Sequence, residues 1–398
     1  MRSLKYYLRC LIVCFCLLPS VSIGAEDESG SQSAEWVYDQ RPSVVHINGF
    51  LTAGVSQANP EVNTMLNKFS DDLSFDTKTL LGLQGTLQLS DKFDVTAQIV
   101  AKADRDWDVD LDWVFFRYRL ADDLSFRAGR LRLPFYLFSE SADVGFSYPW
   151  VSPPTEMYLL PLVNYEGVDL LYSASAGDWI HQLQVVGGSV DKDNFKTSYN
   201  YGVNLTSSSG PWTYRASFMA LYDVEFGLPS LSGQPLVEVE DPANYYAMAA
   251  MYDDGDWLLI SELSVVDTAA SKQLFGSDAG YLTVGRHLGR WLPHVTYAKS
   301  YTKDDSPPEV LYRLPPNPAT DNVPANVTAD VLKYASTSYT LGLRYNLNAN
   351  SSLKLQWSHF VELDDTGGKF FNLRFPNPNR AAEVDNVDTY SLVIHMVF

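Results

Sequence analysis

From residue 44 to its end, the chain repeats one pattern of apolar and polar positions. Segments of roughly ten residues alternate between the two kinds of side chain, and each is followed by a turn or a loop. A period of two is typical of a β-strand that has an apolar phase on one face and water on the other. The segments that we predict to be strands are 44–57, 75–90, 92–103, 109–121, 124–135, 164–176, 178–190, 198–208, 211–223, 243–253, 256–267, 279–288, 290–302, 334–348, 350–362 and 387–398. The faces of 243–253 and 279–288 cannot be assigned, because these two segments alternate poorly.

The connections between these segments alternate strictly between short and long. The short ones hold turn residues, as in Ala176-Gly177-Asp178 and Leu288-Gly289-Arg290. The long ones include 58–74, 136–163, 224–242, 303–333 and 363–386, and 104–108 is the exception in size. A soluble sandwich has no reason to place every long loop at one end, whereas an outer-membrane barrel does. The sequence therefore predicts an all-β fold, a transmembrane antiparallel β-barrel of about 16 strands over 44–398.

Aromatic residues mark the ends of the predicted strands. Trp179, Trp212, Trp257 and Trp291 each follow a short turn, where a girdle at the membrane interface belongs, although any one of them could be a core residue. The last strand alternates and ends on Phe398. Such an ending resembles the signal that bacterial outer-membrane proteins present to their assembly machinery.

The first residues predict export. Arg2, Lys5 and Arg9 precede a short apolar run and the small residues that end near Ala25, so we expect a signal peptide over 1–25 and a polar periplasmic leader over 26–43. All three cysteines lie within the signal. After it, no apolar stretch is long enough for a membrane-spanning helix.

The charge of the chain is strongly negative, −19 from 29 basic and 48 acidic residues, and three of the basic residues lie in the signal. Such a balance argues against nucleic-acid binding. It is also compatible with an acidic soluble exported protein. Much of the acid lies in turns and long loops, as at Asp71-Asp72, Asp304-Asp305 and Asp364-Asp365. These groups could bridge to lipopolysaccharide through divalent cations, but solubility of exposed loops explains them more simply.

Strand 124–135 and the loop 136–163 organise the rest of the prediction. Arg130 and Arg132 alternate with Leu131 and Leu133, but Leu124 and Phe126 fall in the phase of the arginines, so either the phase changes near Gly129 or the alternation is imperfect. The loop is rich in prolines, which exclude a regular strand or helix, and its many aromatic residues need a packing partner. We therefore expect a loop folded into a pore, with its acids opposite arginines.

At this point the chain resembles the sixteen-stranded porin family of Gram-negative bacteria over nearly all its exported length. In that family the loop between the fifth and sixth strands folds inward, and 136–163 falls in this position. The resemblance implies a homotrimer and a pore constriction with acids on the loop and bases on the wall. The matching positions are Glu140, Asp143 and Glu156 on the loop, with Tyr148 and Trp150, and Lys102, Arg117, Arg119, Arg130 and Arg132 on the wall. The Pro-Glu-Phe-Gly-Gly motif is absent; Tyr148-Pro149-Trp150 and Pro153-Pro154-Thr155-Glu156 take its place, as in a less-studied branch of exported porins.

The strand phase predicts a basic lumen. Its cations would be Lys78, Lys102, Arg117, Arg119, Arg130, Arg132, Arg215, Arg344 and Lys354. Guanidinium groups stay charged and suit carboxylates and phosphates, so arginines on two neighbouring strands would form a cationic ladder. They could equally pin the loop through its acids, and both roles are compatible.

Catalysis finds little support in the sequence. The six histidines have no metal-ligand spacing, and no nucleophile elbow or phosphate-binding glycine loop occurs, so we expect no enzyme activity, cofactor or metal. We expect a passive outer-membrane channel for small hydrophilic solutes and ions, filtering by size and charge. One alternative is a substrate-specific channel in which Phe135, Tyr136, Phe146, Tyr148, Trp150 and Tyr158 form a sliding surface for sugars or organic anions. A less expected one is an adhesin or receptor with a closed lumen.

Overall fold

The structure is a computed structural model. It describes residues 44–64, 68–159, 163–192, 195–226, 237–239, 242–268, 275–303, 310–313, 326–328, 333–363, 366–370, 373 and 384–398. The predicted signal peptide (1–25) and leader (26–43) lie outside these residues, as do Asp304-Asp305 and Asp364-Asp365.

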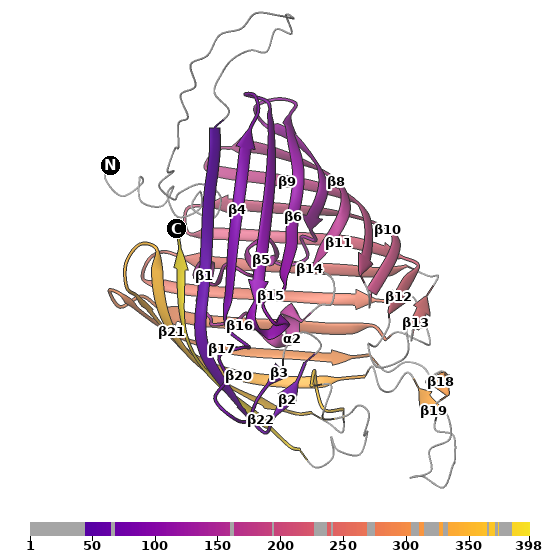
Figure 1. Cartoon of the computed structure of the whole chain (residues 1–398), viewed down its shortest axis with the longest axis vertical. Helices are drawn as coiled ribbons and strands as arrows, with labels where there is room; N and C mark the ends of the chain where they lie inside the picture. Colours follow the sequence, from indigo (N-terminus) through magenta and orange to yellow (C-terminus); the bar gives the residue numbers. More distant parts are fainter. Residues whose placement is uncertain are drawn as a thin grey trace, which may run out of the picture.

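Sixteen strands of the described chain form one closed antiparallel sheet (Figure 1). Each strand pairs with the next along the chain, and the last pairs with the first from Phe50↔Val397 to Asn59↔Asp388. The strands are β1 (Val44–Asn59), β4 (Leu80–Gln88), β5 (Phe93–Lys102), β6 (Val109–Arg119), β7 (Leu124–Arg132), β8 (Asn164–Ala176), β9 (Trp179–Lys192), β10 (Phe195–Ser209), β11 (Trp212–Tyr222), β14 (Ala243–Asp253), β15 (Trp257–Asp267), β16 (Ser277–Arg286), β17 (Trp291–Thr302), β20 (Ala335–Asn346), β21 (Ser351–Val361) and β22 (Val387–Val397). The predicted all-β antiparallel barrel of 16 strands is confirmed.

The remaining elements are small and lie in the longer connections. They are the strand pairs β2 (Val62–Asn63) with β3 (Lys68–Phe69), β12 (Val224–Phe226) with β13 (Val237–Val239) and β18 (Val310–Arg313) with β19 (Asn326–Thr328), the helix α2 (Thr155–Tyr158), and the 3-10 turns η1 (Ala103–Arg105), η2 (Ser139–Ser141) and η3 (Gly145–Ser147). None of the helices in the described residues has the length and apolar character needed to cross a membrane.

The two faces of the barrel wall differ as the alternation predicts. On β6, Val114 and Phe116 are exposed on the outside, while Phe115 between them is buried inside. On β20, Tyr339 and Leu341 are exposed and Thr340 is buried. An apolar outer face without an edge is the arrangement by which strands can cross a bilayer, because every backbone group of the wall has a partner.

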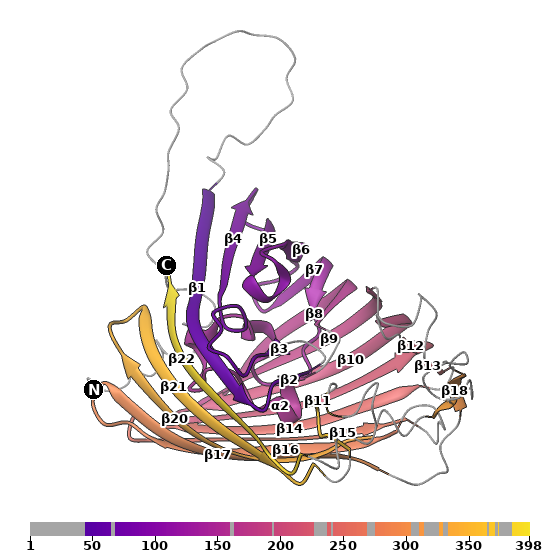
Figure 2. The same ribbon diagram turned by 60° about the horizontal axis from the view of Figure 1, so that its bottom comes forward.

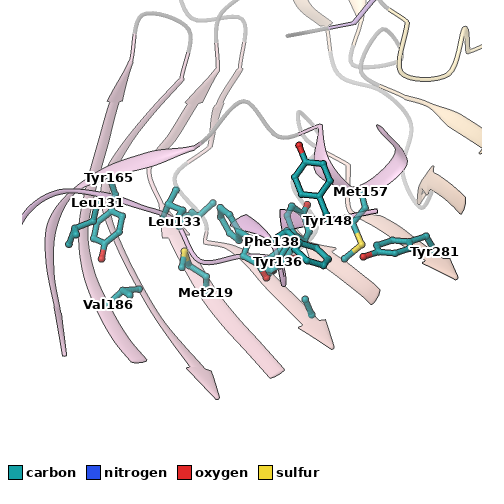
Figure 3. Close-up of a cluster of buried hydrophobic side chains, with 14 of the residues drawn as sticks. Leu131, Leu133, Tyr136, Phe138, Tyr148, Met157, Tyr165, Val186, Met219 and Tyr281 are labelled. Carbon is teal, nitrogen blue, oxygen red and sulfur yellow. Dashed lines mark hydrogen bonds between the residues drawn. The ribbon is translucent and has the colours of Figure 1, made fainter. Parts of the chain in front are cut away.

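The connection between β7 and β8 lies inside the ring of strands, where Figure 2 shows α2 within the barrel. Aromatic side chains of this inner loop (described at residues 133–159 and 163) join one buried cluster with inward residues of the wall. Figure 3 shows Tyr136, Phe138 and Met157 of the loop in this cluster with Met219 of β11 and Tyr281 of β16. The inner loop is thus held by packing as well as by polar contacts.

Candidate functional site

The first contact of the inner loop with the wall is an ion cluster around Asp143. Its carboxylate accepts from Lys102 Nζ at 2.7 Å and also pairs with Arg132. Arg132 is buried and reaches Asp112 on β6 at 2.6 Å as well. Burial alone would raise the pKa of Asp143, but the two cations outweigh burial, so this pKa lies below its usual value. The structure therefore brings together the three predicted residues Lys102, Arg132 and Asp143.

Asp112 reaches the lumen because β6 carries a bulge. The register with β5 shifts between Gln98 and Ile99, so that Gln98 pairs with Trp113 and Asp112 is the extra residue. A bulge turns two consecutive side chains to one face, and Asp112 and Trp113 are both buried. Gln98 Nε2 donates to Asp112 at 3.1 Å.

A second contact involves Glu140 and a residue that the sequence analysis missed, Arg127. Arg127 is buried on β7, where Nε and Nη2 donate to Asp169 of β8 at 2.9 and 2.5 Å. Its Nη2 also lies 3.4 Å from Glu140 Oε1. Gln184 on β9 donates to the same Asp169 at 2.8 Å. Glu140 thus faces an arginine on the wall, although not one of those named from the sequence.

Arg117 and Arg119 lie on β6 with their guanidinium groups turned into the lumen. Both pair with the buried Asp94 on β5, at 3.1 and 3.2 Å. Their side chains remain 29% and 40% exposed. One carboxylate therefore balances two cations that still contact solvent.

Arg130 lies on the outer face of the barrel and not in the lumen. It is opposite Val114 on β6 and Glu166 on β8, and Val114 belongs to the exposed outer face. Its Nε is 3.0 Å from Glu166 Oε1. Arg130 therefore keeps the outward phase of Leu124 and Phe126, and only Arg132, at the end of the strand, turns inward. The expected ladder of four lumen arginines does not form.

On the opposite wall, the inner loop is held by cations that bind its backbone. Lys354 Nζ on β21 donates to the carbonyls of Gly145, Tyr148 and Trp150 at 2.5–2.7 Å. Arg344 Nη1 on β20 donates to the carbonyls of Phe146 and Tyr148 at 3.0 and 3.2 Å. Hydrogen bonds from charged donors contribute about 1.5–3 kcal/mol each. These two predicted lumen cations therefore hold the loop by its backbone carbonyls.

Glu156 does not face an arginine. It is buried in α2, and Ser336 on β20 donates to Oε1 at 3.1 Å. Burial raises the pKa of Glu156 above its usual value, although the hydrogen bonds that its carboxylate accepts lower this pKa in part. The expectation that all three loop acids lie opposite wall arginines therefore holds for Glu140 and Asp143 but not for Glu156.

Tyr148 and Trp150 are packed inside the loop rather than exposed to a passage. Trp150 is 1% exposed, and its indole N–H donates to Thr296 and Thr283 at 2.9 and 3.2 Å. The Tyr148 hydroxyl donates to the Ala142 carbonyl at 2.9 Å. Of the six aromatic residues considered as a sliding surface, Phe135, Tyr136, Tyr148 and Trp150 are buried, and Phe146 and Tyr158 are partly buried.

The lumen also holds acids that the sequence analysis assigned to no site. Asp94, Asp112, Asp169 and Glu262 are all buried and point inward. Glu262 on β15 accepts from Tyr281 at 2.5 Å and from the Leu137 backbone at 2.8 Å, and also from Tyr158. The wall is therefore a mixture of paired charges, and strand phase alone could have identified Asp94 and Asp169 beside the arginines.

The predicted girdle residues follow the short turns on the outer side of the barrel. Trp212, Trp257 and Trp291 are 39–47% exposed, and Trp179 stacks on Tyr214 with ring centroids 6.1 Å apart. Phe398 pairs with Gly49, whose backbone it meets in two hydrogen bonds of 2.7 and 2.9 Å. No group of three potential metal ligands occurs among the described residues.

No protein-family model matches the chain, and no curated protein matches it by sequence. Several solved structures match it by shape. Outer-membrane expressed OmpT of Vibrio cholerae has a TM-score of 0.54 at 10% identity, over 91% of this chain and 99% of that one. OmpF of Salmonella typhi, in complex with daunomycin, has a TM-score of 0.54 at 12% identity, over 89% of this chain and 98% of that one. The anion-selective porin from Comamonas acidovorans has a TM-score of 0.55 at 11% identity, over 89% of this chain and 100% of that one. The chain is thus a 16-stranded barrel structurally similar to Gram-negative general porins.

Proposed function

We propose that this porin-like barrel is a passive channel of a bacterial outer membrane for small hydrophilic solutes and ions. The observation that carries the proposal is the closed wall, apolar outside and polar inside, with a loop tucked into its lumen. A water-filled barrel selects by the width and fixed charges of its narrowest part. Homotrimer assembly, contact with lipopolysaccharide and delivery by the assembly machinery belong to the same proposal; one similar structure, OmpT of Vibrio cholerae, is described in a trimer form.

The charge filter that we propose prefers anions. Arg117 and Arg119 share one carboxylate and stay in contact with solvent, so they present positive charge to the lumen. The ion cluster of Lys102, Arg132 and Asp143 serves mainly to hold the inner loop, because its charges are paired. The aromatic sliding surface has no support, since most of those rings pack against the wall.

Recording from the refolded full chain in planar lipid bilayers tests the proposal. We expect stable conductance steps, and a reversal potential in a KCl gradient that shows a preference for chloride. Replacing both Arg117 and Arg119 with Gln should shift the reversal potential toward cation preference, while Arg130→Gln, on the outer face, should leave it unchanged. A folded barrel without conductance steps would support the closed receptor instead, and an unchanged potential in the double variant would refute the charge filter.

A further inference from the structure

A cavity lies in the lumen between the inner loop and the barrel end that carries the short turns. Its wall comes from β6 to β11, and Glu140 of the inner loop also lines it. Its volume is about 210 Å³, enough for a small organic molecule. Arg117, Arg119, Arg127 and Arg215 all line it. We call it the arginine cavity.

Arg215 is the cation of this cavity that forms no ion pair among the described residues; the carboxylate that acts on it from a distance, Glu262, accepts hydrogen bonds from Tyr158, Tyr281 and the Leu137 backbone. The contacts of Arg215 are neutral: Nη2 donates to the Pro134 carbonyl at 2.9 Å, and Nε and Nη1 lie 3.4 Å from the hydroxyls of Ser217 and Thr206. A guanidinium has five N–H groups in a planar fork, so donors remain for a ligand. The two carboxylates at the mouth, Asp122 and Asp123, are exposed in a turn and are screened by solvent.

Asn204 supplies an independent sign of a ligand. It lines the cavity from β10 and is only 2% exposed, yet neither its Oδ1 nor its Nδ2 has a hydrogen-bond partner in the described structure. Its cross-strand neighbours are engaged elsewhere: Gln184 donates to Asp169, and Ser217 contacts Arg215. A buried amide without partners costs free energy, so a ligand or water that supplies both a donor and an acceptor would be stabilised there.

We propose that the arginine cavity is a binding site for a small hydroxylated carboxylate. The carboxylate would pair with the unpaired guanidinium of Arg215, with Arg119 close to the mouth as a second cation, and a hydroxyl would both donate to and accept from Asn204. A hydroxyl fits this amide because it is at once donor and acceptor. The proposal rests on the proposed channel function and adds to it the class of solute that pauses during passage.

Calorimetric titration of the folded full-length barrel in detergent tests this site with D-glucuronate, D-glucose and acetate as probes. We expect saturable binding of glucuronate at least tenfold tighter than that of glucose or acetate, because glucose lacks the charge and acetate lacks the hydroxyls. Arg215→Gln should abolish measurable binding. Asn204→Ala should weaken it about thirtyfold, the effect of two lost neutral hydrogen bonds.

Asn200→Ala is the matched control, because Asn200 lies on the same strand and face, is equally buried, and does not line the cavity. It should bind glucuronate like the wild type. If Asn204→Ala does not fold, the isosteric Asn204→Asp replaces it and should repel glucuronate. Equal affinity for glucuronate and acetate, or wild-type affinity in the Asn204 variant, would overturn the proposal. Conductance without binding refutes the site alone, whereas binding without conductance refutes the channel and leaves the site.

Discussion

Individual residues show how far strand phase can be followed from sequence. Arg117 and Arg119 were predicted in the lumen and lie there, because β6 alternates regularly up to its bulge. Arg130 was predicted beside them and lies outside. The phase on β7 was inferred from the alternation of Arg130 and Arg132 with Leu131 and Leu133. Arg132 lies where the strand ends and the chain turns inward, so its direction does not indicate that of Arg130. Because Arg127 has the opposite phase to Arg130, the same inference left Arg127 out of the predicted lumen.

Lys354 is the residue whose loss should change the inner loop most. Lys354→Met removes the charged donor of the Gly145 and Trp150 carbonyls and leaves the Tyr148 carbonyl with Arg344 alone. We expect amide hydrogen exchange of residues 145–151 to accelerate about tenfold or more, the effect of losing about 1.4 kcal/mol or more of local stability. Lys299→Met is the control, since Lys299 pairs with Glu362 at an exposed position. Unchanged exchange in the Lys354 variant would show that packing alone holds the loop.

Lys78 should make selectivity depend on pH. Its Nζ donates to Ser152 of the inner loop at 2.8 Å, and burial lowers its pKa to about 8 despite the opposing effect of Asp104. A lowered pKa means that the positive charge is present below about pH 8 and lost above it. We expect the reversal potential to move toward cation preference between pH 7 and 9. In Lys78→Met this movement should disappear; if it persists, another group is responsible.

At the scale of elements, the two strands whose faces could not be assigned are informative. β14 and β16 alternate poorly because their inward side chains include Tyr245 and Tyr281. Tyr245 packs edge-on against Phe135, and Tyr281 against Trp150, with ring centroids 4.6 and 5.5 Å apart. The lumen face of these strands is apolar because the inner loop covers it. The alternation of residues along a single strand does not show that a loop covers its lumen face. The aromatic content of the loop did indicate that the loop needed a packing partner.

Trp150 is the centre of this covering contact. Trp150→Ala should lower the free energy of unfolding by about 3–5 kcal/mol, typical of a fully buried aromatic residue. Denaturant unfolding followed by gel mobility of the folded barrel measures this. Trp291→Ala is the control, because Trp291 lies on the exposed outer face. In detergent this change should lower the free energy of unfolding much less, because the surroundings of the site stay apolar. An equally small loss for Trp150 would mean that the loop is held by its polar contacts.

At the scale of the whole molecule, the strand number, the strict order of pairing and the position of the inner loop were predictable. They follow from period-two alternation and from the alternation of short and long connections, which leave few other closed arrangements. The network inside the lumen was not predictable, because it depends on side chains distant in sequence, such as Asp143 with Lys102 and Gly145 with Lys354.

Phe398 adds a backbone pair to the seam between β1 and β22 that closes the barrel. Deleting Phe398 removes the backbone pair with Gly49, so the amount of folded protein in the outer membrane should fall while the conductance of each assembled channel stays the same. Gly49→Val should act in the same direction, because a Cβ there would lie 2.4 Å from the Phe398 ring. Gly85→Val is the control, since its Cβ would meet open space. Heat-dependent gel mobility measures the folded fraction, and normal levels of the truncated chain would contradict the prediction.

The distance along the chain between Lys354 and the carbonyls it binds has a consequence for biogenesis. Gly145 precedes its donor by 209 residues, so during synthesis the inner loop leaves the ribosome well before β20 and β21. During that interval its carbonyls lack the charged donors Arg344 and Lys354. We therefore expect the loop to be held only once β20 and β21 are in place, and a polypeptide cut short before Arg344 to leave residues 145–150 open to added protease.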